Sequence, residues 1–185
     1  MIIIGITGTL GAGKGTIVDY LVARKGYTHY SVRNFLIQEI EKQGLPVNRD
    51  SMVKVGNALR TMHCPSYITD CLFEQAKANG TNAIIESIRT EGEVLSLRNQ
   101  PHFYLLAVDA DARLRYQRIR LRQSETDLVS YEEFIANEQR EMHNTDPNKQ
   151  NLSRCISMAD FTLNNNADIA RLHAQIEQIL IQIEQ

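Results

Sequence analysis

Short apolar runs alternate along the chain with longer stretches in which apolar residues recur every three or four positions. The runs predicted as strands span residues 2–7, 27–30, 83–87, 103–108 and 161–163. The first, third and fourth runs are almost entirely apolar, which is typical of parallel strands covered on both faces of a sheet.

The stretches between these runs have helical spacing. Residues 13–25 place apolar side chains on one face and are followed by Gly26, a helix stop signal. Residues 32–43 repeat this form, and residues 50–79 predict two helices broken near Pro65. Ser130, with a glutamate three positions on, predicts a capped helix start, and a last helix begins near residue 167. This alternation predicts one α/β domain, residues 1–185, with a parallel sheet and helices on both faces.

Composition narrows the class of protein. The 185 residues carry a net charge of −2, so no general basic field favours nucleic acid or an anionic membrane surface. Three cysteines without CxxC spacing favour a reducing cytosol, and we expect a cytoplasmic protein. No apolar run reaches the length of about 18 residues that a membrane span needs, so neither a span nor a membrane partner is expected.

The clearest motif follows the first predicted strand, in "ITGTLGAGKGT". Gly8, Gly13 and Lys14 have the G-x-x-x-x-G-K spacing of a phosphate-binding loop. Several N–H groups must turn inward at once around a phosphate chain, and glycine permits the positive φ values that this requires. A glycine-rich turn with no ligand is the alternative, but the preceding strand and the following amphipathic helix favour nucleotide binding.

One position departs from the commonest form of this loop. The residue after Lys14 is glycine instead of Ser or Thr, and Thr16 comes next. This resembles the loop of the adenylate-kinase type. The resemblance implies that Thr16 supplies the hydroxyl on the Mg²⁺ side, with the metal held largely through water. The predicted ATP-binding residues of the loop are Gly8, Gly11, Ala12, Gly13, Lys14, Gly15 and Thr16.

Two further groups complete the predicted donor side. Glu86 ends an apolar strand, where a carboxylate can orient the water around Mg²⁺, so we expect Thr16 and Glu86 on the metal side. In "DARLRYQRIRLRQ", a helical wheel places Arg115, Arg118 and Arg122 within about 60° of each other, with Arg113 and Arg120 together on a nearly opposite face. We expect Arg118 and Arg122 to contact phosphate. Lys14, Glu86, Arg118 and Arg122 are the predicted catalytic residues. Residues 123–130, which are polar and follow directly, form a candidate lid.

Over nearly its full length the chain resembles the P-loop nucleotide and small-molecule kinases, both the adenylate-kinase group and dephospho-CoA-kinase-like proteins. This resemblance implies a three-layer fold with strand order 2-3-1-4-5. It also implies that residues 31–79 form a helical acceptor-binding segment and that Arg33, Arg60 and Arg89 hold the acceptor's anionic group. "ADFTLNNN" implies that Asn164 shapes the adenine side of the ATP site.

The resulting hypothesis is an ATP- and Mg²⁺-dependent phosphotransferase that acts on a nucleotide-like small molecule. Dephospho-CoA kinase is one alternative, although "HYSVRN" lacks the aspartates that this family carries after its second strand. A non-catalytic ATP-binding or ATPase regulatory module is another. A GTPase is disfavoured, since residues 148–151 read "NKQN" where guanine recognition needs "NKxD".

Overall fold

The computed structural model describes residues 1–122 and 129–184 as a parallel sheet between helical layers. The strands are β1 (Ile3–Gly8), β2 (Thr28–Ser31), β3 (Ala83–Glu86), β4 (Phe103–Asp109) and β5 (Phe161–Asn164). All the strand pairs are parallel, and their order is β2-β3-β1-β4-β5. The predicted fold class and strand order are therefore confirmed.

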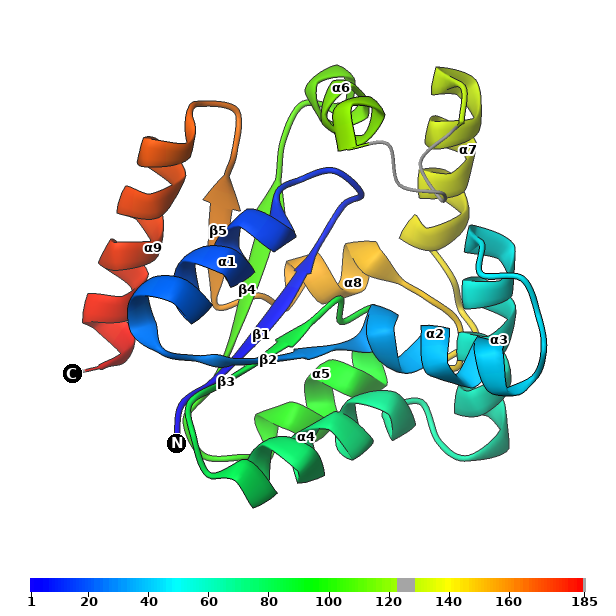
Figure 1. Cartoon of the computed structure of the whole chain (residues 1–185), viewed down its shortest axis with the longest axis horizontal. Coiled ribbons are helices and arrows are strands. Elements are labelled where there is room, and N and C mark those ends of the chain that lie inside the picture. The colour runs from blue at the N-terminus through cyan, green and yellow to red at the C-terminus, as the bar shows by residue number, and fades with distance from the viewer. Residues whose placement is uncertain (123–128, 185) are drawn as a thin grey trace.

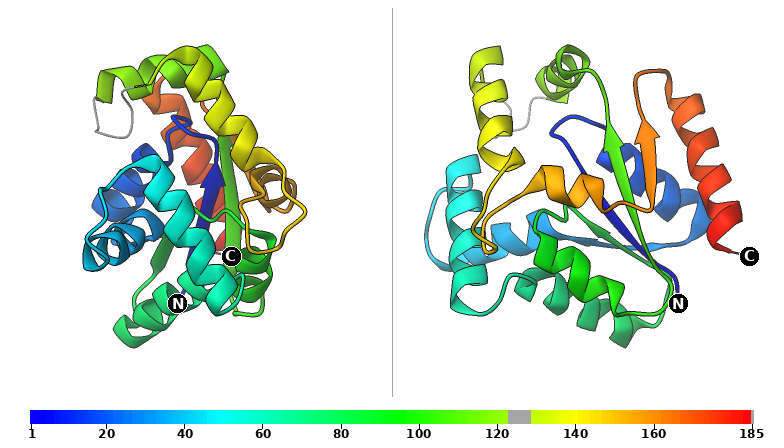
Figure 2. Two further views of the ribbon diagram at one scale, coloured as in Figure 1. Left: turned by 90° about the vertical axis from the view of Figure 1, so that its right-hand side faces the viewer. Right: turned by 180° about the vertical axis from the view of Figure 1, so that it is seen from behind.

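The helices surround this sheet (Figures 1 and 2). Five helices precede β4 in the chain: α1 (Lys14–Lys25), α2 (Val32–Lys42), α3 (Arg49–Met62), α4 (Tyr67–Asn79) and α5 (Glu91–Arg98). The remainder are α6 (Ala112–Arg122), α7 (Tyr131–Met142), α8 (Leu152–Ser157) and α9 (Ile169–Ile183). None of the helices in the described ranges is both long and apolar enough to cross a membrane.

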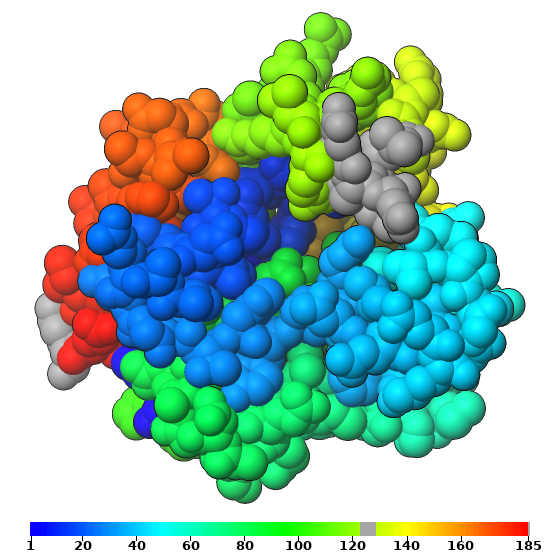
Figure 3. Space-filling model, in the orientation of Figure 1, coloured from blue at the N-terminus to red at the C-terminus, as the bar shows by residue number. Residues whose placement is uncertain are grey.

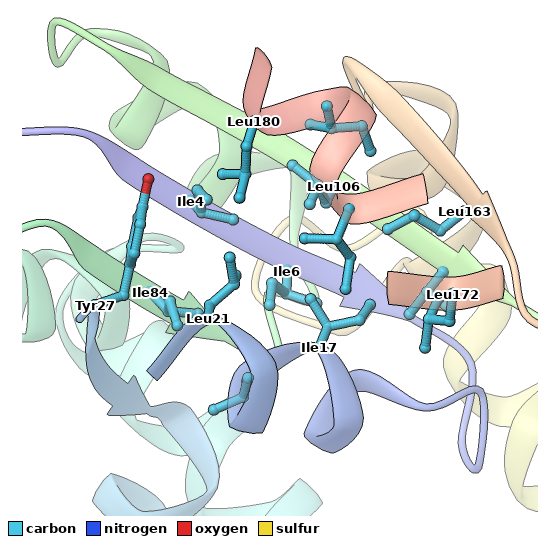
Figure 4. Packing of buried hydrophobic residues seen from close by; sticks show 14 of the residues in the cluster. Ile4, Ile6, Ile17, Leu21, Tyr27, Ile84, Leu106, Leu163, Leu172 and Leu180 are labelled. Carbon is cyan, nitrogen blue, oxygen red and sulfur yellow. The ribbon is translucent and has the colours of Figure 1, made fainter. Parts of the chain in front are cut away.

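Alternating strand residues divide the core into two clusters. Ile4 and Ile6 of β1 face α1 and α9, where Leu21 and Leu180 pack against them (Figure 4). The neighbouring Ile3 faces the opposite side, in a cluster built mainly from α2, α4 and α5. This period of two, with both faces apolar, explains why the buried strands read as continuous apolar runs.

Most predicted elements match the structure within a residue or two, and the predicted helix stop at Gly26 and helix start at Ser130 are both observed. Gly26 ends α1 with a φ of 69°, and the Ser130 side chain accepts from the Glu133 N–H in a capping box at the start of α7. Helices α5 and α8, which are short, were not predicted from the sequence. A second capping box, formed by Thr90 and Glu93, marks the start of α5 and is a signal that could have found it.

All five strands end at the same edge of the sheet, because they are parallel. Gly8, Ser31, Glu86 and Asp109 therefore lie at one edge, each at the carboxyl end of a different strand. Open α/β sheets bind their ligands at this edge. The fold thus brings together polar and loop residues from stretches that lie far apart in the sequence.

Candidate nucleotide and acceptor site

The loop between β1 and α1 has the backbone geometry of a phosphate cradle. Gly8, Gly11 and Gly13 have φ values of 140°, 78° and 107°, in the region that only glycine occupies readily. Gly13 is the N-cap of α1, and the N-terminal end of this helix lines the cleft. The N–H groups of its first turn have no partner within the helix and are free to bind a ligand. The helix N-terminus adds partial positive charge to the same place.

Lys14 is the first residue of α1, and its buried side chain folds back against the loop. Its Nζ donates to the Gly8 and Thr9 carbonyl oxygens, at 2.9 Å each. Burial, and then the nearby charge of Arg89, lower the pKa of the Lys14 ammonium from 10.5 to about 8. Because this ammonium has lost its water of hydration, a nearby phosphate oxygen would stabilise its charge strongly.

The pKa of Lys14 gives a prediction for stability. The unfolded chain binds this proton more tightly than the folded chain does, so the free energy of unfolding rises between pH 8 and 10.5, the two values that bound the shift. We expect the difference in unfolding free energy between the wild type and Lys14→Met to move in favour of the wild type by about 3 kcal/mol across this window. Urea unfolding of both proteins at several pH values measures it, and a difference that does not change with pH contradicts it.

The glycines give a second prediction, with a matched control. A Cβ on Gly13 would lie 2.2 Å from the Asn165 Nδ2, at a φ of 107°, whereas a Cβ on Gly15 would meet nothing within 4 Å. We expect Gly13→Ala to lose about 1–3 kcal/mol of stability and Gly15→Ala, within helix α1, to lose none. Thermal unfolding without nucleotide tests this, and equal melting temperatures for the two variants would be the wrong outcome.

Asn165 connects three parts of the donor side. Its Nδ2 donates to the Ala12 carbonyl at 2.8 Å, its N–H donates to the Asp109 carbonyl, and its own carbonyl accepts from Arg118 at 2.9 Å. The predicted residue, Asn164, is outside the cleft, where its side chain accepts from the Asn166 N–H. Asn164 is the last residue of β5, in register with Asp109, and the next residue, Asn165, lines the cleft.

The helical wheel separates the exposed arginines of α6 from the others, but it does not distinguish Arg115 from Arg118 and Arg122. Arg118 and Arg122 line the cleft, while Arg113 and Arg120 are exposed and do not. The Arg118 Nη1 is buried and makes no hydrogen bond within the described part of the chain. Arg115 is buried and supports the loop from behind, since it donates to the Leu10 carbonyl and pairs with Glu138.

Oxygen donors suited to Mg²⁺ lie beside Lys14. The Thr16 hydroxyl and the Glu86 carboxylate both line the cleft, and Mg²⁺ prefers such oxygen ligands together with phosphates and water. Glu86 accepts from the Ser87 hydroxyl at 2.5 Å, and Ser87 holds a positive φ of 74°. The donor set therefore fits the ion, and the described residues contain no cluster of three His, Cys, Asp or Glu that would hold a metal alone.

A second group of arginines lines the cleft, in the region that the resemblance assigns to the acceptor, and one of them was not predicted from the sequence. Arg33 and Arg89 line the cleft, and so does Arg49, the first residue of α3. Arg49 and Arg89 donate to different oxygens of Glu141, from α7, and Arg89 also donates to Gln150 at 3.1 Å. Burial alone would raise the pKa of the Glu141 carboxyl, but the charges of Arg89 and Arg49 outweigh it and lower this pKa.

Arg60, predicted to bind the acceptor, has a different environment. Its side chain is only 1% exposed, at the wall of the cleft, and its Nε and Nη2 donate to Glu93 Oε1 at 3.1 and 2.8 Å. The other Glu93 oxygen accepts from the N–H groups of Arg89 and Thr90. Arg60 is thus tied to the residue that holds the Arg89 backbone.

Both sides share one cleft of about 860 Å³. Figure 3 shows the hollow between the blue phosphate-loop region, the green α6 and the cyan-blue α2 and α3. Of the predicted site residues, the cleft is lined by Gly11, Gly13, Lys14, Gly15, Thr16, Arg33, Arg60, Glu86, Arg89, Arg118 and Arg122. Gly8 and Ala12 support the loop through their carbonyls. The candidate lid falls on residues 123–128, outside the described residues, and on the cap of α7.

Fold and loop together define a P-loop protein of the kinase-like kind. A kinase-like fold is also what the solved structures show. The match to TT1252, a protein from Thermus thermophilus, covers 98% of this chain and 97% of TT1252, with a TM-score of 0.66 and 19% identity. Shikimate kinase from Bacteroides thetaiotaomicron covers 100% and 99%, with a TM-score of 0.58 and 11% identity.

The chain belongs to the AAA domain family, whose family model matches residues 4–145. Relatives that match along their full length include a UPF0200 protein from Methanococcus vannielii, 28% identical over 193 residues with 100% of both chains covered. Another from Thermococcus kodakarensis is 25% identical over 189 residues, with 99% and 98% covered. The predicted membership of the P-loop kinase-like superfamily is therefore confirmed.

Proposed function

We propose that this protein is an ATP-dependent phosphotransferase, which moves the γ-phosphoryl group of ATP to a nucleotide-like small molecule with an anionic group. The observation that carries the proposal is that one cleft joins a phosphate loop with its buried lysine to a second cluster of arginines. An ATPase that used water alone would need no such cationic acceptor side. The kinase-like neighbours support the same reading of the fold.

Lys14 and the loop N–H groups hold the β- and γ-phosphates of ATP in this proposal. Arg118 and Arg122 meet the charge that develops on the moving phosphoryl group, and the buried Arg118 Nη1 has a hydrogen bond to give. Mg²⁺, near Thr16 and Glu86, would neutralise charge between the phosphates. Catalysis is then mainly positioning and electrostatic stabilisation, with no covalent intermediate.

The acceptor side favours a phosphate-bearing acceptor over a simple alcohol. Arg33, Arg49 and Arg89 bring guanidinium groups, which match phosphate oxygens in pairs. A phosphate oxygen is already anionic and needs no base, whereas an alcohol does. Glu141, the carboxylate on this side, is already engaged by two arginines. These contacts disfavour dephospho-CoA kinase, which would need a base for its hydroxyl.

ADP release in the presence of ATP and Mg²⁺ tests the proposal. The panel contains nucleoside monophosphates, dephospho-CoA and shikimate, with no added acceptor as the reference. We expect at least one nucleotide-like acceptor to raise ADP release well above the reference and to gain a phosphoryl group by mass. ADP release that no acceptor stimulates would instead indicate an ATPase or a regulatory module. We place the reaction in the cytoplasm, in line with the free cysteines.

A further inference from the structure

Glu141 is held between two arginines of the cleft. Its two oxygens accept from two different arginines, Arg49 at 2.6 Å and Arg89. All three residues line the cleft. Two guanidinium groups that converge on two oxygens of one carboxylate form the same charge-assisted pattern by which arginines hold phosphate.

The arginines keep further donors for such a group. The Arg49 Nε is buried and makes no hydrogen bond among the residues that the structure describes. Arg49 also begins α3, where the partial positive charge of the helix N-terminus opposes a cation. Burial then lowers the pKa of Arg49, although Glu141 partly offsets this. A cation at such a place costs stability unless an anion compensates it.

Helix α7, which carries Glu141, lies outside the two core clusters. It lies beside α6 and above α3, away from the sheet (Figures 1 and 2). Phe134 is fully buried among aromatic rings of α6 and α7, and ion pairs such as Glu138 with Arg115 also hold the helix.

A place for the displaced carboxylate lies next to the cleft. Glu141, Gln150 and Val53 line both the main cleft and a second cavity of about 360 Å³. His143 and Lys149 are on the walls of the second cavity. The Glu141 side chain can therefore leave the two arginines and still face polar and cationic groups.

We propose that Glu141 determines which acceptors bind, because it is a resident counter-ion of Arg49 and Arg89 that the acceptor's anionic group must replace. This inference rests on the proposed function, since it concerns the acceptor side of the same cleft. A neutral acceptor gains nothing by displacing Glu141. A phosphate group, with several oxygens and up to two charges, accepts from both arginines and reaches the remaining donor of Arg49.

Inorganic phosphate is the probe that tests this proposal. The phosphate loop is first saturated with a non-hydrolysable ATP analogue and Mg²⁺, so that added phosphate is directed to the acceptor side. Binding is followed in ¹⁵N spectra through the Nε–H signals of Arg49 and Arg89, which are assigned with Arg49→Lys and Arg89→Lys. These signals report the acceptor side directly, whether or not the protein turns over ATP.

We expect Glu141→Gln to bind phosphate about tenfold more tightly than the wild type, because one opposing charge has been removed close to the ligand. Glu138→Gln, which breaks an equivalent ion pair one turn away on α7, should leave phosphate affinity at the acceptor side within about twofold. Glu141→Asp, which keeps the charge on a shorter side chain, should lie between the wild type and Glu141→Gln, and it carries the test if Glu141→Gln does not fold.

Unchanged or weaker phosphate binding in Glu141→Gln, or in Glu141→Asp where that variant stands in for it, overturns the proposal. So do Arg49 and Arg89 signals that do not respond to phosphate. Failure of the ATP analogue to bind would overturn the proposed function instead, and the two arginine signals would still show whether Glu141 competes with phosphate. The two failures are thus distinguishable.

Discussion

Arg118→Ala is expected to lower the rate of phosphoryl transfer by about 10³-fold or more, with ATP binding weakened far less. Arg118 lines the cleft beside the phosphate loop, and its Nη2 is held by the Asn165 carbonyl at 2.9 Å. The buried Nη1 is then fixed in place without a hydrogen bond of its own among the described residues. A donor held in this way stabilises charge that develops in the transition state and needs no reorganisation at that moment.

The measurement is single-turnover phosphoryl transfer, together with the dissociation constant of ATP. Arg113→Ala is the matched control, because Arg113 belongs to the same helix but is exposed and outside the cleft. It should leave both quantities nearly unchanged. Equal losses in the two variants would mean that Arg118 acts only through the charge of α6. A large loss of ATP affinity in Arg118→Ala, with transfer from bound ATP unaffected, would assign it to binding alone.

Arg60→Met is expected to lower the free energy of unfolding by about 3–5 kcal/mol, because it leaves the Glu93 carboxylate buried without its cation. Both side chains are almost fully buried, at 1% and 0% exposure. A loss of this size is a large part of the total stability of an ordinary domain. Denaturant unfolding of the wild type and the variant measures it.

The double variant Arg60→Met with Glu93→Gln separates the charge from the packing. The glutamine removes the buried charge but retains an oxygen for the N–H groups of Arg89 and Thr90, which Glu93 now accepts. We expect it to recover most of the lost stability. A loss below about 1 kcal/mol in Arg60→Met would show that the Glu93 charge does not depend on Arg60.

The fold was predictable because its signals are local and agree with one another. The apolar runs of β1, β3 and β4 are typical of buried parallel strands, and the stretches between them have helical spacing with caps at Gly26 and Ser130. The phosphate loop was predictable for the same reason, since Gly8, Gly13 and Lys14 have a fixed spacing that follows from phosphate geometry. The strand order, however, came from the resemblance and not from the pattern.

The acceptor side was predictable only in part, because its partners lie far apart in the sequence. Nothing in the local sequence shows that Arg60 meets Glu93, 33 residues away, so its burial in an ion pair was not foreseen. Arg49 lies in a polar stretch with no motif, and Glu141 reaches it across 92 positions. Such contacts arise from tertiary packing, which the spacing of residues along one helix does not encode.

In the proposed function, the loop between β1 and α1 binds the phosphates of ATP together with the side chain of Lys14. Calorimetric titration of ATP with Mg²⁺ into the wild type and into Lys14→Met tests it most directly. We expect saturable binding of one ATP to the wild type, weakened by about 100-fold in the variant, since a buried charge-assisted contact is lost. No binding to the wild type, or the same affinity in both proteins, would contradict it.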